Sequence, residues 1–195
     1  ISYRRLGKTR EWIESFLKPL LESHLRQELG RQPEIFVDSA IETGDTWPKT
    51  LQNTLSNSRI VILLWTKTFR ESLWCTREVG HMLEREKRYG YRTEANPKGL
   101  VFQLVIHDGD TIPEGLSEIQ KLNLQDFFKL TLSKDGGRYT EFEDKIKSQA
   151  EPLGSAIESV PDWVQNWNIE LDNDFVTKLY IDQAGTQTQP PKFTN

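Results

Sequence analysis

The stretch Ile60–Val61–Ile62–Leu63–Leu64–Trp65 is the longest uninterrupted apolar run in the chain. A strand inside a parallel sheet is covered by helices on both faces, so it lacks the alternation of apolar and polar residues seen in a half-exposed strand. The run therefore predicts a central strand of a parallel sheet. It is also much shorter than the roughly 20 apolar residues that cross a bilayer, so we expect no membrane segment.

Shorter apolar runs on both sides of this strand alternate with helical patterns. We expect further strands at residues 1–3, 35–37, 100–106 and 122–128, and helices that include residues 10–29 and 72–89. Pro19 lies inside the first of these helices, where a proline disrupts the helical hydrogen bonds. The alternation predicts a flavodoxin-like, doubly wound α/β fold with a five-stranded parallel sheet and helices on both faces.

Composition excludes several classes of protein. The 195 residues carry 25 basic and 29 acidic side chains, a net charge of −4, whereas a nucleic-acid-binding protein normally shows a basic excess. Cys75 is the only cysteine, so an intrachain disulfide and a Cys-rich zinc site are both excluded, and we expect a cytoplasmic protein. Neither a dinucleotide-binding glycine fingerprint nor a P-loop is present.

Ligands of doubly wound sheets bind outside the carboxyl ends of the strands. In this sequence that rule selects Arg4, Arg5, Asp38, Trp65, Thr66, Lys67, Asp108 and Asp110. This mixed, partly aromatic edge suits a ligand with phosphates, sugars and a base. The two arginines after the first strand argue against a phosphoacceptor domain, which needs carboxylates there to hold Mg²⁺.

His107, Asp108 and Asp110 are potential metal ligands, but they belong to one short turn with no partner elsewhere in the sequence. We expect an ordinary turn at the end of a strand, and no metal site.

The helix that begins near Ser72 places Trp74 and Glu78 on one face, because residues four apart share a helix face. The start of this helix lies at the predicted ligand edge. Spacing alone leaves two interpretations open: a catalytic glutamate, or a solvated glutamate one turn from a core tryptophan.

Three motifs together resemble the TIR (Toll/interleukin-1 receptor) domain, particularly its bacterial and plant type. They are Ile1–Ser2–Tyr3–Arg4–Arg5, then Phe36–Val37–Asp38 with Gly44 and Trp47 downstream, and Ser72–x–Trp74–Cys75–x–x–Glu78. The resemblance covers roughly residues 1–150. The family often has a Ser-Pro pair after its third strand, where this chain has Trp65–Thr66–Lys67.

The resemblance implies an enzyme that breaks the bond between nicotinamide and ribose in NAD⁺. It implies that Glu78 is catalytic, that NAD⁺ is a substrate, and that no cofactor or metal is needed. Residues implied to bind the substrate are Tyr3, Arg4, Arg5, Asp38, Gly44, Trp47 and Trp74. Whether the product is linear or cyclic ADP-ribose stays open.

The resemblance also implies partners. Self-association through TIR–TIR contacts, including assembly into a filament, would activate an effector of bacterial antiphage immunity joined to or associated with a sensor. The alternative is a non-enzymatic adaptor that acts by the same assembly. We expect no direct contact with nucleic acid or membrane.

We divide the chain into a TIR domain at residues 1–153, an extension of unknown role at 154–184, and a linker or disordered tail at 185–195. Trp163 and Trp167 in the extension predict an element that packs on the domain or on a neighbour.

Overall fold

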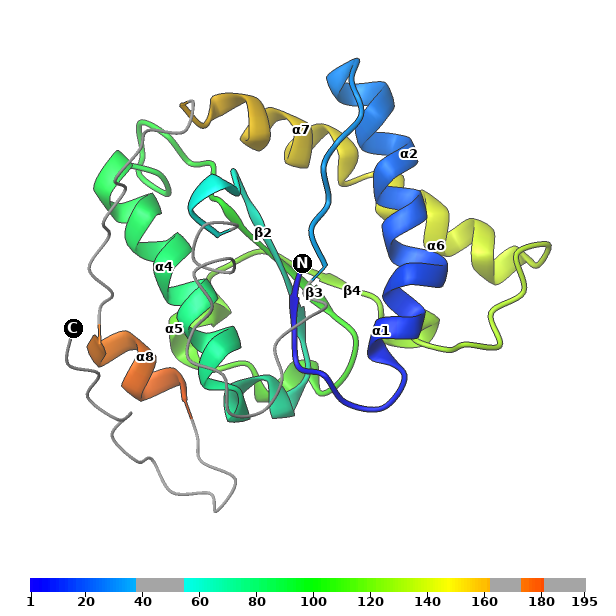
Figure 1. Ribbon diagram of the computed structural model, residues 1–195, viewed down its shortest axis with the longest axis horizontal. Coiled ribbons are helices and arrows are strands. Elements are labelled where there is room, and N and C mark those ends of the chain that lie inside the picture. The colour runs from blue at the N-terminus through cyan, green and yellow to red at the C-terminus, as the bar shows by residue number, and fades with distance from the viewer. Residues whose placement is uncertain (38–54, 162–172, 181–195) are drawn as a thin grey trace.

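A four-stranded, all-parallel sheet forms the centre of the computed structural model, which describes residues 1–37, 55–161 and 173–180 (Figure 1). The strands are β1 (Ser2–Tyr3), β2 (Val61–Trp65), β3 (Val101–Val105) and β4 (Lys121–Asn123), and they lie side by side in that order. In the register, Leu63 of β2 lies between Ser2 of β1 and Gln103 of β3. The predicted α/β fold with a parallel sheet is confirmed.

The predicted number of strands is wrong for the described residues, which contain four strands instead of five. Residues 35–37 are not part of a strand, although the amino group of Ile1 donates a hydrogen bond to the carbonyl of Phe36 over 2.6 Å. This bond places the segment beside β1, the position of the second strand in a doubly wound sheet. β1 forms its regular ladder with β2 on the other side.

The apolar run in β2 is buried on both faces, as predicted. Ile62 and Leu64 belong to one hydrophobic cluster, whereas Leu63 and Trp65 belong to a second cluster on the opposite face. Successive strand residues point to opposite faces, so each layer of helices receives half of the run.

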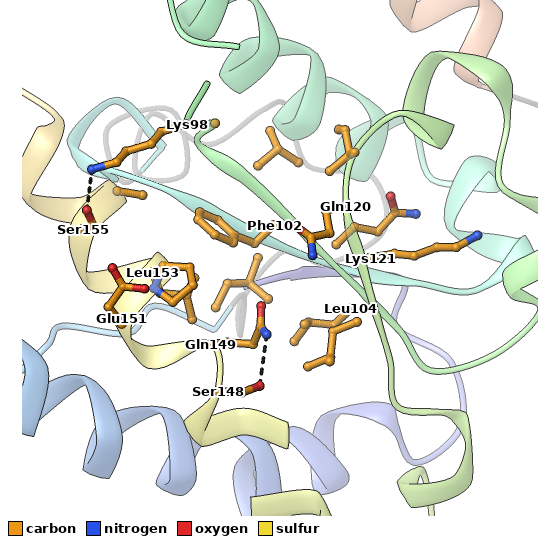
Figure 2. A pocket seen from close by; sticks show the side chains of 18 of the residues that line it. Lys98, Phe102, Leu104, Gln120, Lys121, Ser148, Gln149, Glu151, Leu153 and Ser155 are labelled. Atoms are coloured by element: carbon orange, nitrogen blue, oxygen red, sulfur yellow. Dashed lines mark hydrogen bonds between the residues drawn. The ribbon is translucent and has the colours of Figure 1, made fainter. Parts of the chain in front are cut away.

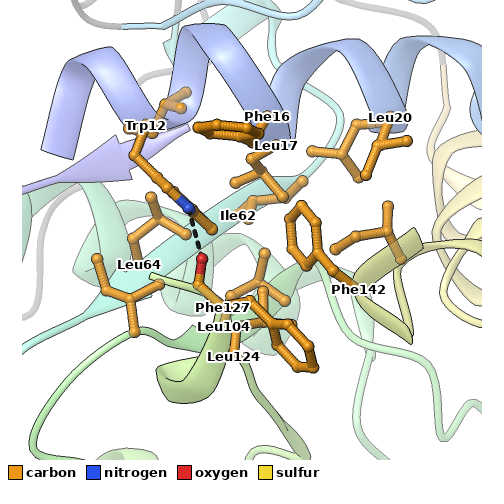
Figure 3. Packing of buried hydrophobic residues seen from close by; sticks show 14 of the residues in the cluster. Trp12, Phe16, Leu17, Leu20, Ile62, Leu64, Leu104, Leu124, Phe127 and Phe142 are labelled. Atoms are coloured by element: carbon orange, nitrogen blue, oxygen red, sulfur yellow. Dashed lines mark hydrogen bonds between the residues drawn. The ribbon is translucent and has the colours of Figure 1, made fainter. Parts of the chain in front are cut away.

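The first layer consists of α1 (Thr9–Trp12), a π-helical turn (Ile13–Leu17), α2 (Lys18–Leu29) and α6 (Gly137–Lys147). Trp12 is buried in its core, 1% exposed, and its Nε1 donates to the carbonyl of Phe127 over 2.9 Å (Figure 3). Pro19 directly follows the π-helical turn in an otherwise continuous helix, with helical backbone at Leu17 and Lys18. A π-turn interrupts the regular i→i−4 hydrogen bonds, so a residue without an N–H does less harm there.

The second layer consists mainly of α4 (Leu73–Tyr89), which follows a 3₁₀ segment at Lys67–Glu71. Val79 and Met82 of α4 pack against Val61 and Leu63 of β2 in the second cluster. The short helix α5 (Glu114–Ser117) lies on the same side of the sheet (Figure 1). The remaining short elements are 3₁₀ turns at Gly109–Thr111 and Gln125–Phe127.

The described parts of the C-terminal region pack on the domain itself. Helix α7 (Ala150–Ser159) contacts α2, and α8 (Asn173–Leu179) contacts α4. Arg59 anchors the end of α7, since its Nη1 donates to the carbonyls of Ile157 and Val160, each over 3.0 Å. The division at residue 153 stays a prediction, and Gly154 lies inside α7. Trp163, Trp167 and the tail at 185–195 lie outside the described residues.

Candidate active site

The candidate site begins at the first turn of α4. Ser72 has an extended backbone and caps the helix, because its side chain accepts a hydrogen bond from the backbone N–H of Cys75 over 3.3 Å. Serine at this position satisfies one of the N–H groups that a helix start leaves without a partner. The predicted start of this helix is therefore confirmed.

Cys75 ties this turn to the end of β1. Its Sγ donates to the carbonyl of Tyr3 over 3.3 Å, and its side chain is only 5% exposed. The start of α4 thus lies against the carboxyl end of β1, the edge where doubly wound sheets bind ligands.

Glu78 lies one helical turn after Cys75 and is 7% exposed. Burial, followed by the charge of Glu78, raises the pKa of the Cys75 thiol to about 12, although the charge of Arg4 lowers it. The thiol is therefore protonated near neutral pH, so Cys75 is not a ready nucleophile. Glu78 and Arg4 therefore both lie close enough to the thiol for their charges to affect its pKa.

The residues after β1 differ in their surroundings. Tyr3 is 3% exposed, and its side chain belongs to the hydrophobic cluster of the first layer. Arg4 is half-buried, and its Nε is buried with no hydrogen-bond partner among the described residues. Arg5 is exposed. A buried guanidinium N–H without an acceptor costs free energy, so Arg4 is a donor that an anionic group would satisfy.

Trp74 is half-buried on the same helix, one turn before Glu78, and the guanidinium carbon of Arg77 lies 5.9 Å from the centre of its ring. Burial lowers the pKa of Arg77 below its ordinary value. Sequence reasoning did not single out Arg77, although its i, i+3 spacing from Trp74 indicates this contact. Asp38, Gly44 and Trp47, the other predicted substrate-binding residues, lie outside the described residues.

The carboxyl edge also holds the turn after β3. The Oδ2 of Asp108 accepts hydrogen bonds from His107 Nδ1 over 2.9 Å and from the backbone N–H of Lys67 over 3.4 Å. Asp110 is exposed. No cluster of three or more histidine, cysteine or acidic side chains suited to a metal ion occurs in the described part of the chain.

Two cavities lie away from Glu78. One, of about 540 Å³, lies between the amino-terminal halves of β3 and β4 and the α6–α7 junction; Phe102 and Leu153 line it (Figure 2). The other, of about 530 Å³, lies at the carboxyl edge and includes Thr66 and Asp108. Neither cavity is lined by Arg4, Arg5 or Glu78.

The chain shares sequence similarity with known proteins over part of its length. The chain is similar to disease resistance protein RPS6 of Arabidopsis thaliana, with 33% identity over 69 residues, which are 35% of this chain and 6% of that protein. A second protein of the same name and organism matches equally. No solved structure matches the chain significantly.

None of the helices in the described residues is both long and apolar enough to cross a membrane. The model of the TIR domain family matches residues 1–136, well over half of the 195. The chain therefore belongs to the TIR domain family.

Proposed function

We propose that the chain is an NAD⁺ glycohydrolase that cleaves the bond between nicotinamide and ribose, with Glu78 as its catalytic group. The observation that carries the proposal is the placement of the Glu78 carboxylate, 7% exposed, on the first turns of α4 where this helix meets the end of β1. Membership of the TIR family, which includes NAD⁺-cleaving enzymes, supports it.

The chemistry needs only one carboxylate. Nicotinamide in NAD⁺ is already cationic, so it leaves as a neutral molecule and requires no proton donor. The two carboxylates of an ordinary glycosidase therefore reduce to one. Glu78 would accept hydrogen bonds from the ribose hydroxyls and stabilise the oxocarbenium-like charge that develops as the bond breaks.

Arg4 supplies the second part of the site. Its Nε has no hydrogen-bond partner among the described residues, and the charges of both Arg4 and Glu78 act on the Cys75 thiol, so Arg4 would bind the pyrophosphate while Glu78 binds the ribose. A guanidinium suits this role because its fork of N–H groups can bind two phosphate oxygens at once. Trp74 would form the wall of the pocket.

We further propose that the enzyme acts as an effector of immune defence, activated by self-association, and of the antiphage kind that the sequence predicts. TIR domains commonly self-associate, and the similarity to a disease resistance protein supports an immune role. This chain spans only 6% of that relative, so activity, trigger and sensor all belong to the proposal.

The test is the release of nicotinamide from NAD⁺, followed by chromatography, for the natural chain and for Glu78→Gln, which keeps the shape of the side chain and removes its charge. Glu84→Gln is the matched control, since Glu84 lies on the same helix and pairs with Lys87 over 3.5 Å at the surface. We expect Glu78→Gln to lower the rate at least a hundredfold and Glu84→Gln to leave it unchanged.

Equal release from the natural chain and Glu78→Gln would refute the role of Glu78. No release at any protein concentration, including conditions under which the chain is oligomeric, would refute the enzyme and favour the adaptor. The co-product peak separates linear from cyclic ADP-ribose. Activation by self-association predicts a rate per molecule that rises with protein concentration, and a constant rate would contradict it.

A further inference from the structure

The cavity of about 530 Å³ at the carboxyl edge lies where the chain leaves neighbouring strands in opposite directions. From β1 it continues into α1 on one face of the sheet, and from β2 it continues into α4 on the other face (Figure 1). Such a switch point opens a crevice, and this is where open α/β sheets bind their ligands. The volume lies within the roughly 300–1,000 Å³ of small-molecule sites.

Asp108 forms a fixed acceptor on the polar wall of this cavity. Its backbone carbonyl accepts hydrogen bonds from Trp65 Nε1 over 3.1 Å and from the Thr111 hydroxyl over 2.7 Å. Its backbone is in the left-handed region, at φ 50°, a conformation that aspartate tolerates better than most residues. Two hydrogen bonds, from Trp65 and from Thr111, thus hold Asp108 in this left-handed conformation.

The carboxylate of Asp108 is held as firmly as its backbone. Burial opposes ionisation, but hydrogen bonds from His107 and from the backbone of Lys67 outweigh it and lower the pKa of Asp108. Beside it, the hydroxyls of Thr66 and Thr68 share a hydrogen bond of 3.0 Å and line the same cavity. An ionised carboxylate with adjacent hydroxyls suits a sugar diol, because a diol offers two donors to one carboxylate.

Part of the cavity lining is apolar. Leu6 lies on it and is 47% exposed, and Phe128 lies edge-on to Trp12 with their ring centres 5.3 Å apart. The indole N–H of Trp12 is already bonded to a backbone carbonyl, so it offers no donor to a ligand. The apolar side chains of Leu6 and Phe128 suit a flat aromatic base.

Two lysines complete the lining. Lys8 and Lys129 are exposed on separate loops, and neither forms an ion pair with another described residue. Lysine side chains are flexible cations that bind phosphate as point charges.

We propose that this crevice binds a nucleoside monophosphate at a site separate from Glu78, with the base on Leu6 and Phe128, the ribose diol on Asp108, and the phosphate on Lys8 and Lys129. The site is independent of the proposed catalytic function, since neither Arg4 nor Glu78 lines it. It also gives a role to the Trp65–Thr66–Lys67 sequence, in which this chain departs from the family: each of the three residues bonds the Asp108 turn or lines the crevice.

The test is titration calorimetry with AMP, supported by saturation-transfer NMR, in parallel with adenosine and with ribose 5-phosphate. Asp108→Asn removes the charge but keeps the shape and tolerates the left-handed backbone. Thr68→Val removes one hydroxyl. Lys147→Ala, an exposed lysine at the end of α6, is the control for the charge substitutions Lys8→Ala and Lys129→Ala.

We expect AMP to bind more tightly than adenosine or ribose 5-phosphate, and Asp108→Asn to weaken it about tenfold or more. Thr68→Val should weaken it about threefold, and the two lysine variants should reduce its salt dependence, whereas Lys147→Ala should leave the affinity unchanged. Thermal unfolding confirms that each variant is folded.

Three results would overturn the proposal. The first is that AMP does not bind. The second is that AMP binds the natural chain and a folded Asp108→Asn variant with equal affinity. The third is that only Glu78→Gln loses AMP binding, which would place the nucleotide at the candidate active site. Because AMP lacks the nicotinamide bond, failure here is distinct from failure of nicotinamide release.

Discussion

The stability of this protein should fall in mild acid because of one histidine. His81 on α4 is 7% exposed, and its Nε2 has no hydrogen-bond partner among the described residues. Burial, followed by the charge of Arg85 one turn further along, lowers the pKa of His81 from 6.5 to about 4. Between these values the unfolded chain binds a proton that the folded chain does not, so the folded state loses stability as the pH falls below about 6.5.

The magnitude follows from the two pKa values. Each pH unit between them is worth about 1.4 kcal/mol, so protonation of the unfolded chain at His81 costs the folded state about 2 kcal/mol at pH 5 and about 3 kcal/mol below pH 4. Above pH 7 the contribution is close to zero. Because the imidazole is almost fully buried, solvent screening reduces this effect little.

The assay is urea unfolding, followed by circular dichroism, at pH 7.5 and at pH 5. His81→Leu removes the titrating group and keeps an apolar side chain at the buried position, and His107→Gln is the control, since the side chain of His107 is 67% exposed. Protonation of carboxylates at pH 5 also lowers the free energy of unfolding, and it does so in every variant. The informative quantity is therefore the difference between variants in the loss from pH 7.5 to pH 5. We expect the pH-dependent loss to be about 2 kcal/mol smaller in His81→Leu than in the natural chain or in His107→Gln. An equal loss in all three would refute the reasoning.

Three further predictions concern contacts that hold α4 in place. Glu86 is 3% exposed and accepts hydrogen bonds from Arg92 and from the backbone N–H groups of Leu100 and Val101. Glu86→Gln should therefore lower the free energy of unfolding, measured by urea titration, by about 3 kcal/mol. A change below about 1 kcal/mol would contradict the importance of these hydrogen bonds. A Cβ at Gly99 would overlap the guanidinium of Arg92, so Gly99→Ala should displace that side chain and lower the melting temperature; thermal unfolding no different from the natural chain would show that the contact is unimportant. Cys75, 5% exposed and with a pKa of about 12, should react with a thiol reagent at pH 8 far more slowly in the folded chain than in urea, and equal rates would mean that the start of α4 opens readily.

Local sequence was sufficient for the elements that lie nearest the candidate site. The run at residues 60–65 predicted a strand buried on both faces, and Ser72 followed by an amphipathic pattern predicted the start of α4. Both predictions hold because the hydrophobic periodicity and the capping residue act within a few residues of chain. For the same reason, the i, i+4 spacing of Trp74 and Glu78 correctly placed them one turn apart.

Long-range geometry was not predictable in the same way. Residues 35–37 have the composition of a strand, yet they make no regular ladder, since a ladder depends on how the segment aligns with its neighbour in space and not on composition alone. Pro19 appeared to conflict with a continuous helix, and a π-turn directly before it interrupts the regular i→i−4 hydrogen bonds within that helix. The metal alternative for His107, Asp108 and Asp110 was open from sequence, whereas the structure uses Asp108 to bond Lys67 and His107.

By itself, the sequence determined the class of fold, the order of its elements along the chain and the family, because each depends on patterns within single segments or on short motifs in order. The tertiary structure alone decided which side chains meet. Cys75 reaches the carbonyl of Tyr3 across 72 positions of sequence, and Trp65 reaches Asp108 across 43. Such contacts depend on strand register and on the face from which each helix approaches, neither of which a local pattern specifies. For this reason Glu78 and Arg4 could be named from sequence, but only the packing of α4 on β1 shows that they lie near the same thiol.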